Sequence, residues 1–66
     1  MDVEVLRARF VRTFAKVPTK LRDEIICLVD DKPYNWNSAY IAITGKTATG
    51  DEIIKKLDQI GLLNPE

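Results

Sequence analysis

The chain has 66 residues, of which 45% are hydrophobic and 30% charged, with ten basic residues balanced by ten acidic ones. This length predicts a single domain over residues 1–66, and the composition excludes a disordered chain because enough apolar residues are present to form a core. A zero net charge argues against strong nonspecific polyanion binding, which grows with the number of basic contacts.

Cys27 is the only cysteine, and the chain has no histidine. An internal disulfide is therefore excluded, and a soft-metal site or a histidine-activated nucleophile would lack ligands or a base. The apolar run around Cys27 predicts a buried thiol that packs like a small hydrophobic residue. No apolar stretch approaches the roughly 18 residues of a membrane span, and the acidic N-terminus is unlike a signal peptide. We therefore expect a cytoplasmic protein without cofactor, metal or membrane contact.

The first predicted element is a helix from Asp2 to about Lys16. Its apolar residues recur every three or four positions and form one stripe: Val3, Leu6, Phe10, Phe14 and Val17. Asp2 and Glu4 stabilise the positive end of the helix dipole. Pro18 ends the helix because the residue before a proline is disfavoured in the helical conformation.

A second helix is expected from Thr19 to about Asp30, with Thr19 as its cap and the acidic residues at 23–24 in its first turns. Its apolar residues at helical spacing are Leu21, Ile25, Leu28 and Val29, and Ile26 and Cys27 widen the apolar surface. This width predicts the central buried helix of the domain. The segment Asp30-Asp31-Lys32-Pro33 ends it.

Residues 34–37 alternate aromatic and polar side chains, and we predict a short extended segment there with a packed Trp36. A short helix should follow over residues 39–44, with Asn37 or Ser38 as its N-cap and Gly45 as its C-terminal stop. The same run is rich in β-branched residues and bounded by turn residues, so a strand is the competing prediction.

The last predicted helix runs from Thr49 to Leu63, where Thr49 as N-cap and Glu52 three residues later form a capping box. Its inner face consists of Ile53, Ile54, Leu57, Ile60 and Leu63. Together these elements predict a mainly all-α fold: a small orthogonal bundle of about four helices, with a helix-turn-helix-like C-terminal half and a short extended segment near 34–37.

None of the short motifs predicts catalysis. The Gly-Lys-Thr at 45–47 resembles the end of a phosphate-binding P-loop, but Tyr40 stands where that motif requires a glycine. The acidic pair at 30–31 lacks the alternating oxygen ligands of a calcium loop. The other paired acids are expected to stabilise first helical turns, and Ser38 is expected to cap a helix because no base is present. We therefore predict a protein that is not an enzyme.

Charge is unevenly spread, because residues 1–22 have six basic and two acidic residues (net +4) whereas residues 23–31 have four acidic residues and no basic one (net −4). Three basic residues of the first helix are spaced so that they project together: Arg9, Arg12 and Lys16. Arg7 and Lys20 could extend this group. It forms either a solvated face or a contact for nucleic acid or an acidic partner. Likewise Tyr34, Trp36 and Tyr40 either pack in the core or stack on bases.

The C-terminal segment resembles the recognition helix and exit of winged-helix and helix-turn-helix domains. Many of these domains end in the form Thr-Val-Ser-x-x-Leu-x-x-Leu-Glu-x-x-Gly-Leu-hydrophobic, which the stretch 49–63 follows. The packing positions of this pattern are matched by Ile54, Leu57, Gly61, Leu62 and Leu63. The resemblance implies a tri-helical core over residues 19–63, with residues 19–30 as its first helix, residues 38–44 as the next and Gly45 in the turn.

Several positions depart from this pattern. Gly50 stands where a residue normally packs, Asp51 and Glu52 place negative charge toward phosphates, and the segment 45–49 is about one residue shorter than usual. No wing is expected after Leu63, so the resemblance implies a wingless core with an added N-terminal helix. It also implies contacts to phosphates, backbone or bases from Lys46, Thr47, Thr49, Lys55 and Lys56.

Two functions of different classes follow. The neutral charge and the acidic start of the last helix favour a small non-enzymatic binding module, a protein-interaction or assembly subunit. The alternative is a helix-turn-helix-type DNA-binding regulator. The candidate contacts for nucleic acid or an acidic partner are Arg9, Arg12, Lys16, Lys46, Thr47, Thr49, Lys55 and Lys56. In either case a homodimer through the N-terminal helix would bury apolar surface that so small a chain cannot bury alone.

Overall fold

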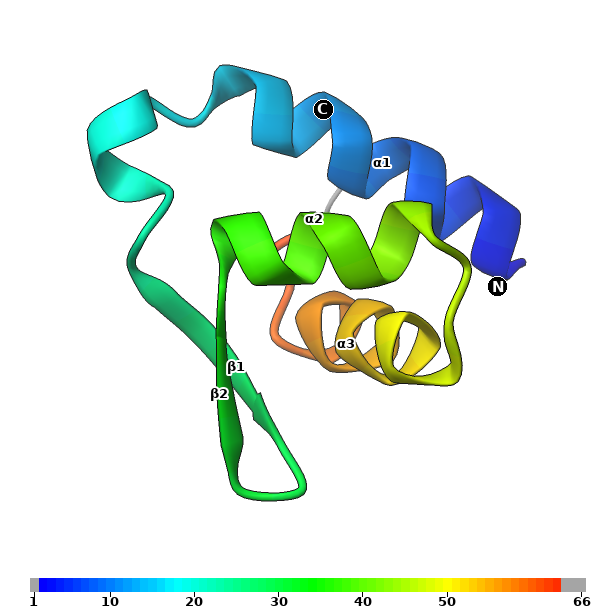
Figure 1. The fold of residues 1–66 in the computed structure, drawn as a ribbon. Helices are drawn as coiled ribbons and strands as arrows, with labels where there is room; N and C mark the ends of the chain where they lie inside the picture. The colour runs from blue at the N-terminus through cyan, green and yellow to red at the C-terminus, as the bar shows by residue number, and fades with distance from the viewer. Residues whose placement is uncertain (1, 64–66) are drawn as a thin grey trace.

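The computed structural model describes residues 2–63, which form three α-helices and one two-stranded antiparallel sheet (Figure 1). The elements in chain order are α1 (Val3–Lys16), the short 3-10 helix η1 (Thr19–Leu21), β1 (Ile25–Val29), β2 (Lys32–Asn35), α2 (Trp36–Thr44) and α3 (Ala48–Gln59). The expected mainly all-α bundle of about four helices is therefore wrong, and the fold is α+β. Residues 64–66, which bear on the expected absence of a wing, lie outside the described residues.

The first helix is confirmed. Asp2 is the N-cap of α1, and its carboxylate accepts a hydrogen bond from the Glu4 amide at 3.0 Å. Val17 adopts an extended conformation before Pro18 and ends the helix, as the steric effect of proline requires. The stripe of apolar residues places Leu6 and Phe10 in the core.

The second predicted helix, over residues 19–30, is wrong. Only Thr19–Leu21 are helical, in a single 3-10 turn, whereas Ile25–Val29 form β1. Five consecutive apolar residues have no helical period, and three of them are β-branched, which favours a strand. Asp30 and Asp31 have φ values of 53° and 66°, the left-handed conformations that a two-residue type I′ turn needs. The acidic pair therefore reverses the chain where we expected it to end a helix.

The hairpin also accounts for the extended segment expected near residues 34–37. Tyr34 and Asn35 belong to β2, but Trp36 already begins α2, so the extended part is shorter at this end than predicted. The strand that pairs with it is β1. In this register Val29 is opposite Lys32, Leu28 opposite Pro33, Cys27 opposite Tyr34 and Ile25 opposite Asn35, with a bulge between Ile25 and Cys27.

The helix at residues 39–44 is confirmed over the competing strand, although α2 begins three residues earlier. Its N-cap is Asn35 and neither Asn37 nor Ser38. The Asn35 side chain accepts a hydrogen bond from the Ser38 amide at 2.7 Å, and the Ser38 hydroxyl accepts one from the Asn35 amide at 3.0 Å. This reciprocal capping box joins β2 to α2 without a loop, and Gly45 ends the helix as expected.

The capping box expected at Thr49 and Glu52 is wrong, because α3 begins at Ala48 with Thr47 as its N-cap. The Thr47 hydroxyl accepts a hydrogen bond from the Gly50 amide at 2.9 Å and donates one to the Ala42 carbonyl at 2.9 Å. Thr47 therefore caps α3 and attaches it to α2 at the same time. The helix ends at Gln59, short of the predicted end at residue 63.

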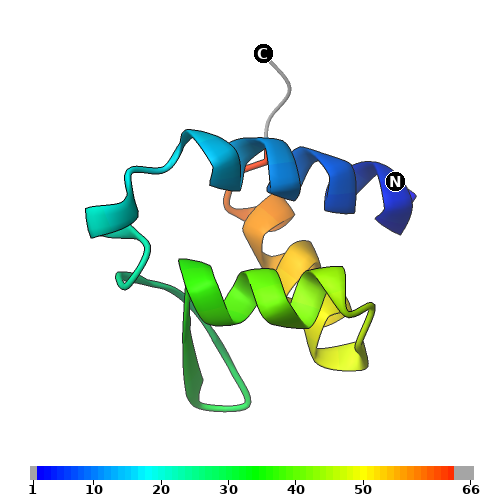
Figure 2. The ribbon, with the colours of Figure 1, turned by 45° about the horizontal axis from the view of Figure 1, so that its top comes forward.

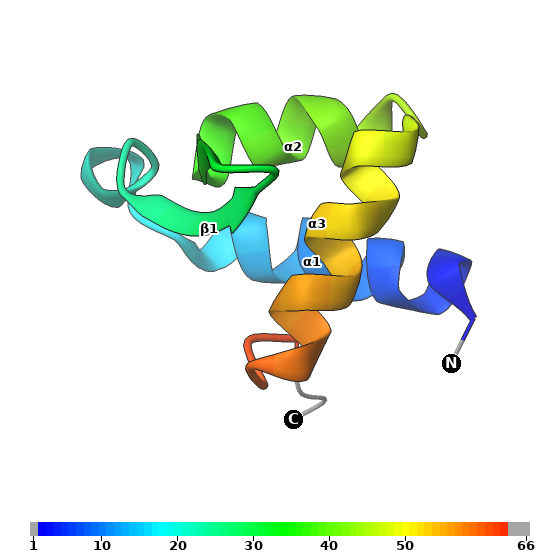
Figure 3. The same cartoon turned by 90° about the horizontal axis from the view of Figure 1, so that it is seen from below.

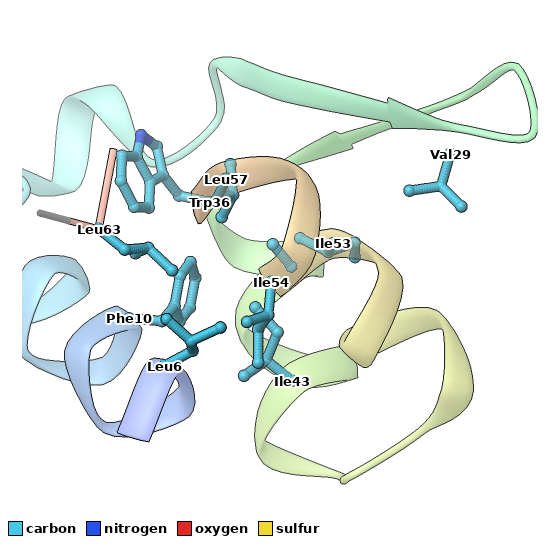
Figure 4. Close-up of a cluster of buried hydrophobic side chains, with 10 residues drawn as sticks. Leu6, Phe10, Val29, Trp36, Ile43, Ile53, Ile54, Leu57 and Leu63 are labelled. Carbon is cyan, nitrogen blue, oxygen red and sulfur yellow. The ribbon is translucent and has the colours of Figure 1, made fainter. Parts of the chain in front are cut away.

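A single hydrophobic core lies among the three helices and the inner face of the hairpin (Figure 4). Its buried residues are Leu6, Phe10, Val29, Trp36, Ala39, Ile43, Ile53, Ile54, Leu57 and Leu63. α3 packs against α1, α2 and β1, and it runs across α2 instead of alongside it (Figure 3). The hairpin projects beyond α2 on the side away from α1 (Figure 2).

Candidate interaction surface

The side chain of Arg7 joins the three helices and does not extend a basic surface. Its Nε donates to the Ile43 carbonyl at 3.1 Å near the end of α2, and its Nη2 donates to Asp51 Oδ1 at 3.0 Å in the first turn of α3. Its Nη1 forms an ion pair with Glu4 one turn back on α1. Because only 11% of this side chain is exposed, Arg7 is a structural residue.

The Arg7 contact also changes the role of Asp51. We expected Asp51 and Glu52 to repel phosphates together at the start of the last helix. The Asp51 carboxylate instead pairs with Arg7, whereas Glu52 is exposed. One of the two charges that opposed a DNA contact is thus partly compensated within the fold.

The candidate basic residues fall into two groups. With about 100° between successive helical residues, Arg9, Arg12 and Lys16 lie about 140–180° around α1 from Arg7 and share one flank. Arg12 and Lys16 are exposed, and Arg9 is half-buried. Arg7 itself reaches the first turn of α3. The shared flank of α1 therefore faces away from the turn between α2 and α3.

The second group surrounds α3. Lys46, Lys55 and Lys56 are exposed, and Lys46 adopts a left-handed conformation with φ of 58° in the turn before α3. Thr49 is half-buried within the helix, and the Thr47 hydroxyl is engaged in the cap. The structure therefore does not gather the eight candidate contacts on one surface.

The aromatic residues mainly build the core. Trp36 is buried and stacks on Phe10 with ring centroids 5.8 Å apart. Tyr40 stacks on Phe14 with ring centroids 4.4 Å apart. The Arg22 guanidinium lies over the Phe14 ring, 4.2 Å from its centroid. Trp36 is thus inaccessible to a nucleic-acid base, and Tyr40 is engaged within the fold.

Cys27 is half-buried, somewhat more accessible than the buried thiol we expected. Burial raises the pKa of the Cys27 thiol above its ordinary value, and the nearby Lys56 opposes this effect only in part. The thiol is therefore protonated at neutral pH and is a poor nucleophile. Within residues 2–63, no cluster of histidine, cysteine and acidic residues has a composition and arrangement that could bind a metal ion.

The outer face of the hairpin is a surface that the sequence pattern did not predict. Pro33 and Asn35 are two residues apart on β2 and share one face, so their partners Leu28 and Ile25 share it as well. The bulge makes this possible, since residues three apart otherwise point to opposite faces. Leu28 and Ile25 are each 56% exposed. We call Ile25, Leu28 and Pro33 the hairpin surface; a sequence signal for it is the apolar run between two acidic pairs.

No family model, curated protein or solved structure matches this chain. In the part of the chain that the structure describes, the helices are also too short or too polar to traverse a lipid bilayer. The functional interpretation therefore depends on the surfaces described above.

Proposed function

We propose that this chain is a small non-enzymatic module that binds another protein through the hairpin surface. The observation that carries the proposal is the exposure of Ile25 and Leu28 side by side on one face of a projecting hairpin. Adjacent exposed apolar side chains are typical of interaction sites, whereas single exposed ones are normal on any protein. A 66-residue domain has little apolar surface to spare from its core, which strengthens this interpretation.

Charge supports the same choice over nucleic acid. The basic residues of α1 and those around α3 form separate groups, and Arg7 is engaged within the fold. A polyanion would therefore meet few basic side chains at once, and its affinity depends on that number. Binding of a protein through apolar contacts does not require such convergence.

The proposal is tested by capturing partners from a native cell extract with the wild-type chain and two variants. Leu28→Lys places a charge on the hairpin surface, whereas Ile41→Lys is the matched control on α2, where the replaced side chain is 71% exposed. Both variants should fold, because neither residue belongs to the core. We expect proteins bound by the wild type and the Ile41 variant to be lost with the Leu28 variant. Equal capture by all three chains would show that the hairpin surface does not bind them.

A helix-turn-helix DNA-binding regulator is the second candidate. It is favoured by the three-residue turn 45–47, which joins two helices that run across each other, a connection typical of that motif (Figure 3). The pairing of Asp51 with Arg7 also removes part of the expected repulsion. Titration with duplex DNA at low and moderate salt tests it. Binding should weaken with salt and with Lys55→Ala, and no retention at low salt would exclude this function.

A homodimer through α1 also stays a proposal. Val5 and Val11 on that helix are exposed, and their burial between two copies would add to a small core. Sedimentation of the purified chain measures the association directly, and a strict monomer at high concentration would exclude it. A cytoplasmic location is likewise proposed, on the basis of the single free cysteine.

A further inference from the structure

The two outer edges of the sheet differ in the hydrogen-bonding groups that they offer. Val29 and Lys32 flank a two-residue turn and therefore form a hydrogen-bonded pair. In an antiparallel ladder such pairs alternate with pairs whose N–H and C=O groups point outward. Leu28 and Pro33, the next pair, are of this second kind. Since proline has no N–H, the outer edge of β2 lacks a donor at that point, whereas Leu28 offers both a donor and an acceptor at the edge of β1.

The outward-pointing groups of Leu28 make no hydrogen bond within the described chain. Outside the β1–β2 ladder, no hydrogen bond within residues 2–63 reaches the backbone of Ile25–Val29. The Leu28 side chain beside these groups is 56% exposed. The bulge near the start of β1 restricts regular pairing to the part of the strand from Cys27 toward the turn. An added strand would therefore be short and centred on Leu28.

The charges around β1 determine which kind of strand can pair with its outer edge. Residues 23–35 contain four acidic residues and one basic residue, Lys32, giving a net charge of −3 (one minus four). The acids lie in pairs at the two ends of β1, at 23–24 and 30–31, and all four are exposed. Glu24, Asp30 and Asp31 have no ion pair within the described residues. On α3, Lys56 approaches Cys27, whose position in the ladder puts it on the opposite face from Leu28.

A second copy of the chain is disfavoured by these acids. Antiparallel pairing of two β1 strands would lay the acidic turn of one copy beside the acidic start of the strand in the other. Parallel pairing would place each acidic pair beside the same acidic pair of the other copy. Like charges facing each other across strands are destabilising, whereas opposite charges stabilise the pair. The edge is therefore complementary to a strand of the opposite charge pattern.

We propose that the edge of β1 accepts one strand from a partner protein, with an apolar centre that pairs at Leu28 and basic residues at both ends. This specifies, and rests on, the protein-binding function proposed for the hairpin surface. Backbone hydrogen bonds to Leu28 supply the alignment, and the acidic pairs select the basic ends. The apolar side chains of the incoming strand extend the face formed by Ile25 and Leu28.

Amide hydrogen exchange measured by NMR tests this arrangement residue by residue. In the free chain the Cys27 and Val29 amides, which face β2, should be protected, and the Leu28 amide should exchange rapidly. The probe is the peptide Lys-Lys-Val-Thr-Val-Thr-Val-Lys-Lys. At a peptide concentration of about ten times Kd, the Leu28 amide should exchange about tenfold more slowly, because exchange then proceeds from the unbound fraction. A peptide with glutamate in place of every lysine is the matched control and should give no protection.

A charge variant separates the two parts of the proposal. The double substitution Asp30→Asn and Asp31→Asn keeps residues that tolerate the left-handed turn and removes two charges. The affinity for the lysine-flanked peptide should fall about three- to tenfold, as expected for the loss of two exposed ion pairs. Equal affinity of the variant would overturn the selection of basic ends by the acids, and a Leu28 amide that stays unprotected with saturating peptide would overturn the strand addition. Protection that rises with protein concentration alone, together with a dimer in sedimentation, would assign the edge to a second copy.

The failure of this inference is distinguishable from failure of the proposed function. Partner capture that is lost with Leu28→Lys, combined with an unprotected Leu28 amide in the captured complex, would keep the function and overturn the strand addition. Peptide protection of Leu28 combined with partner capture that is unaffected by Leu28→Lys would support the edge and overturn the function.

Discussion

The contacts of Arg7 with Glu4, Ile43 and Asp51, which we call the Arg7 junction, contrast with the β1–β2 hairpin. The two regions differ in how many of their polar and apolar groups are paired or buried within the chain. At the junction, one guanidinium group bonds to Glu4 on α1, to the Ile43 carbonyl on α2 and to Asp51 on α3, and only 11% of the Arg7 side chain is exposed. In the hairpin, two large apolar side chains are exposed, an edge is unpaired and four acids lie at the strand ends. The comparison indicates that the junction stabilises the fold, whereas the hairpin keeps apolar side chains and backbone groups that the described chain does not use; our proposal assigns these to a partner.

The largest loss of stability should come from the hydrophobic core. Phe10 is fully buried and contacts Trp36 and Phe14. Phe10→Ala should lower the free energy of unfolding by about 3–5 kcal/mol, from lost burial and the cavity left behind. In so small a domain this change approaches the whole stability, so we expect loss of the cooperative thermal transition. A transition close to that of the wild type would contradict the central position of Phe10.

The next largest effect is expected at the contact between α2 and α3. A Cβ atom added at Gly50 would lie 2.2 Å from the Ala42 carbonyl oxygen, so the helices would have to move apart. Gly50→Ala should therefore destabilise by about 1–3 kcal/mol, although alanine is intrinsically the better helix former. The matched control is Gly45→Ala, whose closest contact of 3.1 Å is less severe. Urea denaturation compares the two, and a more stable Gly50 variant would show that the helices are not closely packed.

A smaller effect is expected from Arg7 itself. Arg7→Met keeps much of the apolar stem but removes the hydrogen bond to Ile43 and the ion pair with Asp51. Asp51 is 40% exposed, so solvent screens the pair, and we expect a loss of about 1–2 kcal/mol. The control Arg12→Met on the exposed flank should change stability by less than about 0.5 kcal/mol. Equal effects of both substitutions would show that the junction contributes no more than the surface.

The smallest effect on stability should occur in the hairpin. Leu28→Thr replaces an exposed side chain with one that suits a strand, and the free energy of unfolding should change by less than about 0.5 kcal/mol. The same variant should weaken partner capture, because it removes apolar contact area. Thermal denaturation measures the stability of the Leu28 variant against that of Phe10→Ala, and partner capture measures its binding. A marked loss of stability would mean that Leu28 packs within the fold.

The sequence predicted the parts of the fold that depend on local signals. The apolar stripe and proline stop gave α1, and Gly45 marked the end of α2 correctly. The hairpin was missed because Ile25–Val29 has no period of its own, and an Asp-Asp pair is a weaker turn signal than Asn-Gly. The start of α3 was misplaced because Thr47 and Thr49 are both suitable caps, and the contact of Thr47 with Ala42 decides between them.

The candidate site was less predictable because its properties depend on tertiary contacts. Arg7 bonds to residues 36 and 44 positions away in the chain, and no local pattern reveals such partners. Spacing did place Arg9, Arg12 and Lys16 on one flank of α1. It could not show that α3 starts on the other side, where Arg7 reaches it. The hairpin surface depends on a bulge, which the alternation of side chains alone does not predict.

Pro33 has a consequence for assembly. A strand with two open edges can continue a sheet from molecule to molecule, which is how cross-β filaments grow. In this chain the missing N–H at Pro33 interrupts the donors along one edge, and the acids around β1 oppose pairing between identical copies at the other. Both features disfavour the addition of one copy after another, so they lower the hazard of open-ended aggregation that exposed apolar residues on a strand otherwise carry.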